Sequence, residues 1–247
     1  MFFNFTGSFS KTSRDLFKIA QEKDLEKIAD YLEAPLEVVK DIKFEVFSSR
    51  ERKQDSDPFR SISRASARFA EMTIYRYWEP NDDPHFPHEI THLVAHTWEK
   101  PYIFPATLDT ADEKEIKRNV EMLSTSFLQE GLAIAVDEII FNRKLLEGGE
   151  RKFSDEWCKE NNNKIPALRE CINFDGFNSF ENKVVVPFTA SLVKFLLTNY
   201  GLRMFKKAYV ETKEIYSSLT NVKIVESIYA KNEDELLRDW RNSLNLR

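Results

Sequence analysis

The sequence contains little glycine and cysteine and no long apolar run, and each shortage excludes something. Only 6 of the 247 residues are Gly, which argues against an all-β fold rich in tight turns. The 2 cysteines, Cys158 and Cys171, form neither a CxxC metal pair nor a disulfide framework. We expect two free thiols, with a single disulfide as the alternative. Because no stretch approaches about 18 consecutive apolar residues, we expect no membrane span.

The charge balance also excludes a class of partner. The formal net charge is −5, and Lys and Arg are spread along the chain except for Arg50, Arg52 and Lys53. A solvated loop explains that short cluster better than a nucleic-acid surface does, so we expect no nucleic-acid partner. The first residues carry neither a basic segment nor an apolar core of signal-peptide length. We therefore expect a cytoplasmic protein, although a signal peptide removed beforehand would leave the same sequence.

The first third of the chain reads as a helix followed by strands. Ser13 is the expected cap of a helix that Pro35 stops, with apolar residues at helical spacing, namely Leu16, Ile19, Leu25, Ile28 and Leu32. Ile42, Phe44 and Val46 alternate as in a half-buried strand. We expect a polar loop over residues 50–61 and a second strand over residues 64–80, in which Ala70, Met72 and Ile74 share one face.

The remainder reads as mainly helical. Helical patterns cover 85–98 and 112–142, residues 150–185 are polar with short helical pieces, and Gly201 breaks two apolar helices between 187 and 210. Asn232 is the expected cap of a last helix with acidic residues in its first turn. This order predicts an α+β fold, with a helix and a small sheet in residues 1–80 and a mainly helical body in residues 81–247. We expect one domain over residues 1–247.

All 4 histidines of the chain lie in the segment HFPHEITHLVAH, residues 85–96. His88, Glu89 and His92 form an H-E-x-x-H motif on an expected helix. One helical turn separates the two histidines, so both imidazoles project from the same face and can bind one metal ion. Glu89 is then placed to accept a proton from an attacking water. The alternative is a helix whose surface histidines flank a glutamate by accident.

A third ligand has to come from another part of the chain, and Glu130 is the best candidate. It lies in SFLQEGLAIAVDEII, where Phe127 and Ile134 on the same side are core-like. A lone carboxylate in such a setting is unfavourable unless it is paired or bound to a metal. Gly131 would let another backbone, or the helix carrying the histidines, approach closely.

The pair HEITH and LQEGLA resembles the gluzincin metallopeptidases, in particular the peptidase-MA-like group. Two later segments, PFTASLVKFLLTNYG and ESIYAKNEDELLRDWRNSL, are similar to the helices that follow in that family, and the resemblance covers roughly residues 63–245. It implies a zincin-like fold and one Zn²⁺ held by His88, His92 and Glu130, with Glu89 as the general base. It also implies an acidic residue near the ligand imidazoles, a position that Asp137 matches, although a surface Asp is the alternative.

One position departs from the family pattern. A Tyr that could stabilise the oxyanion often precedes the Pro of the later helix, whereas this chain has Val186 there. A mobile Tyr or His96 could substitute. His96 itself lies a further turn along, too far to share one ion comfortably.

The resulting hypothesis is a zinc-dependent peptidase that hydrolyses peptide bonds of a peptide or protein substrate. Its main rival is a binding or regulatory protein that keeps the gluzincin fold with little or no turnover. A third possibility is a helical interaction module whose H-E-x-x-H motif is accidental. The second motif, at Glu130, argues against it. The sequence leaves the substrate and the oligomeric state open.

Overall fold

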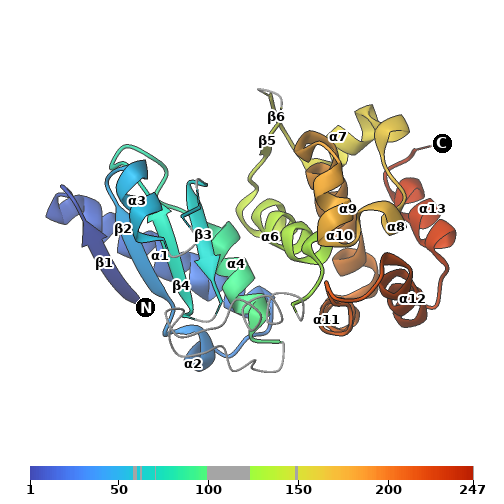
Figure 1. Ribbon diagram of the computed structural model, residues 1–247, viewed down its shortest axis with the longest axis horizontal. Helices are drawn as coiled ribbons and strands as arrows, with labels where there is room; N and C mark the ends of the chain where they lie inside the picture. Colours follow the sequence, from blue (N-terminus) through green and yellow to red (C-terminus); the bar gives the residue numbers. More distant parts are fainter. Residues whose placement is uncertain (58–59, 62, 70, 99–122, 148–149, 247) are drawn as a thin grey trace. The chain divides into compact units, whose positions relative to one another are not determined.

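The computed structural model describes residues 1–57, 60–61, 63–69, 71–98, 123–147 and 150–246. The chain divides into two compact units, Met1–Ile116 and Lys117–Arg247 (Figure 1). The described residues combine many helices with a small mixed sheet near the N-terminus, which confirms the coarse prediction of a small sheet together with helices. The expectation of one domain over the whole chain stays a prediction.

The sheet of the first unit has four strands in the order β1-β2-β4-β3, shown at the blue and cyan end of Figure 1. β1 (Phe2–Thr6) and β2 (Lys43–Phe47) are parallel, as are β2 and β4 (Thr73–Tyr77). β3 (Ala65–Arg68) pairs with β4 in the antiparallel sense and forms one edge of the sheet. Ile42, Phe44 and Val46 are fully buried, so the expected alternation of this strand is confirmed.

α1 (Lys11–Tyr31) packs on this sheet through an aromatic cluster. The Phe17 ring lies 5.9 Å from that of Phe44 and 4.9 Å from that of Trp78, centroid to centroid. The cap of α1 is Ser10 rather than the expected Ser13, because the Ser10 hydroxyl accepts the backbone N–H of Ser13. Leu25, Ile28 and Leu32 are buried as predicted, but Leu16 and Ile19 are exposed because the buried stripe runs through Phe17 instead.

Two sequence predictions in this unit are wrong. The polar segment expected to be a loop contains the helix α3 (Arg50–Ser56), which Ser49 caps. The ammonium group of Lys53 is fully buried and donates to Asp57 at 2.8 Å and to the Ser61 carbonyl at 3.0 Å, so the charges are neutralised locally. The segment expected to be one strand is instead the β3–β4 hairpin, which turns at Met72 with φ 48°. Of the face expected there, Ala70 lies outside the described residues.

The short helix α2 (Leu36–Val39) leads into β2, and α4 (Pro87–His96) follows β4 and packs against α1 and β3.

In the second unit, α10 (Asn182–Tyr200) packs against α6 (Ser126–Phe141), α7 (Ser154–Glu160), α11 (Leu202–Glu211) and α13 (Glu233–Ser243). Gly201 separates α10 from α11 at φ 82°, as predicted. Asn232 caps α13, also as predicted.

Most of the remaining elements of the second unit are short. The predicted helical pieces between 150 and 185 are α7, the 3-10 turn η2 (Asn162–Lys164), α8 (Leu168–Cys171) and α9 (Phe174–Ser179), and α12 (Ser218–Tyr229) precedes α13. A hairpin of β5 (Leu145–Glu147) and β6 (Glu150–Lys152) was not expected from the sequence. The part of the expected 112–142 helix before residue 123 lies outside the described residues.

Cys158 and Cys171 are both free, as expected, and both are buried, which raises the pKa of each thiol. None of the described helices combines the length and the apolar character that crossing a bilayer requires.

Candidate metal centre

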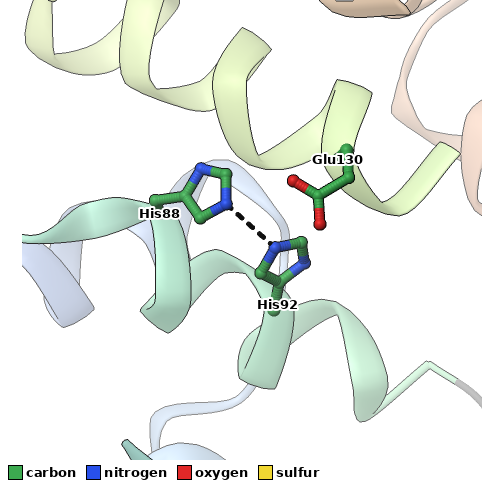
Figure 2. A group of neighbouring side chains, drawn as sticks. All are labelled: His88, His92 and Glu130. Atoms are coloured by element: carbon green, nitrogen blue, oxygen red, sulfur yellow. Dashed lines mark hydrogen bonds between the residues drawn. The ribbon is translucent and has the colours of Figure 1, made fainter. Parts of the chain in front are cut away.

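The two histidines of the H-E-x-x-H motif lie one turn apart on α4 and point their rings toward each other. Their Nε2 atoms are 3.1 Å apart, and the ring planes are nearly perpendicular at 84° (Figure 2). His92 is 7% exposed and His88 is half-buried. The helical spacing therefore brings both imidazoles to one point, as the sequence predicts.

The separation of these two nitrogens has a chemical meaning. Two nitrogens that bind one tetrahedral ion at 2.0–2.1 Å lie about 3.3 Å apart. The observed 3.1 Å is within a few tenths of an ångström of that value. The same distance also fits an N–H···N hydrogen bond between two neutral imidazoles. The two rings are thus either preformed to bind a metal ion or hydrogen-bonded to each other. Binding of a metal ion distinguishes these two cases.

The rest of α4 holds these side chains rigidly. Ile90, Leu93 and Val94 are fully buried, so α4 is a core helix. Glu89 is half-buried and occupies the third position of the helix, directly after the first histidine. A side chain that follows a ligand in this way lies beside the ligand face of the helix rather than on it.

An aromatic ring supports the far end of the pair. Phe69, which follows β3, contacts the ring of His92 edge to face, with centroids 6.5 Å apart. The same ring packs on His96, whose centroid is 4.9 Å away. His96 is half-buried in this contact. The structure therefore gives His96 a packing partner, while its role as a hydrogen-bond donor in the site stays a prediction.

The residue that sequence reasoning missed is Asp24, in the middle of α1. Its buried carboxylate accepts from the backbone N–H of Phe86 at 3.0 Å and lies 2.7 Å from Nδ1 of His85. His85 lies two residues before the first residue of α4, so Asp24 contacts the segment that leads into this helix. The one available signal was an Asp among the apolar positions of an amphipathic helix, and that pattern does not reveal its partners.

In the second unit, Glu130 is half-buried on α6, between Phe127 and Ile134, which are 0% and 5% exposed. Gly131 allows the close approach predicted for it, and the neighbour is α10: a Cβ there would lie 2.9 Å from the backbone oxygen of Thr189. The Thr189 hydroxyl also donates to the Phe127 carbonyl. These contacts fix the start of α6 and so fix the backbone that carries Glu130.

Two further predicted positions belong to the same unit. Asp137 is half-buried on α6, and its backbone carbonyl accepts from Arg143 at 3.2 Å where the helix ends. Val186 is half-buried in the first turns of α10, directly before Pro187. A valine side chain cannot donate a hydrogen bond. The role of Asp137 beside a ligand imidazole remains a prediction.

The three proposed ligands have side chains of the kinds that bind metal ions. His88, His92 and Glu130 each offer one ligand atom, a ring nitrogen or a carboxylate oxygen, and Figure 2 draws the three side chains. Two imidazoles and one carboxylate suit Zn²⁺, which also requires an open position for catalysis. The comparisons with known proteins add no assignment, because no protein family, curated protein or solved structure was found to match the chain.

Proposed function

We propose that the chain is a zinc-dependent peptidase of the gluzincin kind, similar to the peptidase-MA-like group and with a zincin-like fold. The observation that carries this proposal is the pair of Nε2 atoms 3.1 Å apart on α4, within an H-E-x-x-H motif. The helix that carries the pair has Ile90, Leu93 and Val94 fully buried and His92 buried, which supports a built site over accidental surface histidines. Glu130 completes the proposed set as the third ligand.

The proposed ligand set leaves one position open for water and substrate. When bound, Zn²⁺ supplies a Lewis acid that polarises the scissile carbonyl and acidifies water. The protein's side chains would position the ion and balance part of its charge. His88 and His92 hold their nitrogens in place through the rigid backbone of α4, and Glu130 contributes a negative charge that balances part of the charge of a divalent ion.

Glu89 is the proposed general base. It follows the first ligand directly and is half-buried on the same helix, where it is positioned to accept a proton from the attacking water. The same carboxylic acid then delivers that proton to the leaving amine of the cleaved bond. The substrate class is a peptide or protein. The proposed reaction is the net addition of one water across one peptide bond.

The experiment that tests this proposal joins zinc analysis with one isosteric variant. Glu89→Gln keeps the size of the side chain but cannot accept a proton. We expect one zinc per chain in both proteins, cleavage of a mixed peptide library by the wild type, and at least a hundredfold loss of cleavage in the variant, the lower end of the range for a general base. Unchanged cleavage by the variant would refute Glu89 as the base.

A second candidate is a gluzincin-fold binding protein with little or no turnover. The observation that favours it is Val186, which places an apolar side chain where the family often has a hydroxyl donor. Loss of such a donor lowers the rate by about 10²–10³. Zinc binding without chelator-sensitive cleavage of any library peptide would select this candidate.

A further inference from the structure

The segment that leads into α4 is held by three side chains from other elements of the first unit. The side-chain amide of Gln21 on α1 donates to the Pro84 carbonyl. One turn further along α1, Asp24 accepts from the backbone N–H of Phe86 at 3.0 Å. From β4, the guanidinium of Arg76 lies 3.5 Å from the centre of the Phe86 ring. Residues 84–86 are therefore fixed before α4 begins.

Asp24 stands out in this set because it is a buried carboxylate. It is 1% exposed, and its second oxygen lies 2.7 Å from Nδ1 of His85. Burying a carboxylate is unfavourable unless hydrogen bonds or opposite charge compensate. The N-terminus of a helix supplies both, through its unsatisfied N–H groups and its positive dipole end.

The helix α4 has no N-terminal cap of its own. Its N-cap residue is Phe86, which has no side-chain oxygen, and Pro87 takes the first helical position. In a capping box, the Glu at the third helical position reaches back to the N-cap N–H. In α4 that third position is Glu89, the proposed base. Asp24 accepts the N–H that Glu89 would otherwise bind.

We infer that Asp24 is a positioning residue of the metal centre: it fixes the start of α4, and so the direction of His88, and it leaves Glu89 available for proton transfer. This inference rests on the proposed function, because it concerns the same site. Asp24 acts through the backbone of Phe86 and touches neither the metal nor the substrate. Loss of its carboxylate would let the first turn of α4 shift while the rest of the helix stays buried.

The test measures the affinity for zinc alone, by competition with a chromophoric chelator at a temperature where every protein is folded. Asp24→Ala is expected to weaken zinc binding on the order of tenfold, the lower range for groups that orient metal ligands. It is also expected to change the visible absorption of the Co²⁺-substituted protein. Asp24→Asn keeps an acceptor for the Phe86 N–H and is expected to recover most of the affinity.

Phe17→Leu is the matched control, since Phe17 is fully buried on the same helix and packs on the sheet. It is expected to lower the unfolding temperature while leaving zinc affinity unchanged. If Asp24→Ala does not fold, Asp24→Ser is used instead. The serine side chain is too short to reach the Phe86 N–H, so this variant also removes the contact.

The claim that Asp24 keeps Glu89 from capping α4 is tested by unfolding temperatures. In the Asp24→Ala background, Glu89 can bind the Phe86 N–H in place of Asp24, so Glu89→Ala is expected to lower the unfolding temperature more there than in the wild type. Equal effects in the two backgrounds would refute this part of the inference.

If Asp24→Ala has the same zinc affinity and the same Co²⁺ spectrum as the wild type, the positioning role is overturned and the proposed function stays intact. If the wild-type chain binds no zinc, both the positioning role and the proposed function are overturned.

Discussion

Lys194 on α10 forms an ion pair with Glu138 on α6, with Nζ and Oε2 2.7 Å apart. The Glu138 side chain is 2% exposed and also accepts from the backbone N–H and the hydroxyl of Ser154. Lys194 reaches Asp155 at 2.7 Å as well. The pair thus joins α6, which carries Glu130, to the central helix of the second unit and to α7.

Replacing this lysine is expected to destabilise the second unit strongly. Lys194→Met removes the cation and leaves the buried Glu138 carboxylate with the hydrogen bonds from Ser154 but no cation beside it, so the free energy of unfolding should fall by about 3 kcal/mol. Denaturant unfolding at pH 7 measures this. Glu138→Gln in the Lys194→Met background is the control, because it removes the uncompensated charge and should restore part of the loss.

The same lysine predicts the direction of a pH effect. Burial alone lowers the pKa of Lys194, but its hydrogen bonds and charge interactions with Asp155 and Glu138 outweigh this and raise the pKa above its ordinary value. Its contribution is therefore fully present below about pH 10 and is lost as the pH rises through the folded-state pKa. Unfolding measured from pH 8 to pH 11 should show a steeper alkaline loss in the wild type than in Lys194→Met.

Close packing at Gly131 predicts that this position tolerates no side chain. A Cβ there would lie 2.6 Å from a Val193 methyl carbon and 2.9 Å from the Thr189 backbone oxygen, which cannot move aside as a flexible side chain can. Gly131→Ala should lower the free energy of unfolding by about 1–3 kcal/mol, although Ala has the higher helix propensity. Thermal unfolding decides this, and a variant as stable as the wild type would show that α6 and α10 pack less closely.

The zinc content of two histidine variants separates ligands from neighbours. His92→Ala should abolish stoichiometric zinc, because it removes one of the two convergent nitrogens. His96→Ala, one turn further along the same helix, should retain one zinc per chain because His96 packs on Phe69. Metal analysis of the purified variants provides the measurement. Loss of zinc from both, with folding intact, would place His96 among the ligands.

Local patterns in the sequence predict much of this fold, since they are set by near neighbours in the chain. The alternation at Phe44 and the caps at Asn232 and Gly201 are properties of a few consecutive residues. The helix α3 was missed because its stabilising pair, Lys53 and Asp57, is buried by the fold, whereas in the sequence it resembles an exposed polar loop. The β3–β4 turn was missed because Met72 adopts a left-handed conformation that Met rarely takes.

In the candidate site too, local features could be predicted from the sequence and tertiary contacts could not. The helical period alone predicts that His88 and His92 converge, and the structure confirms it. Asp24 could not be found in this way, because it lies 62 residues before Phe86 and its role exists only once α1 packs on α4. The approach of α10 to Gly131 likewise depends on the tertiary packing of the second unit.

A crystal structure of the zinc-loaded chain, with anomalous data at the zinc edge, would locate the metal ion. We predict one ion, bound at about 2.0–2.2 Å by Nε2 of His88, Nε2 of His92 and a carboxylate oxygen of Glu130. An anomalous peak elsewhere, or no peak together with a direct hydrogen bond between the two imidazoles, would contradict it.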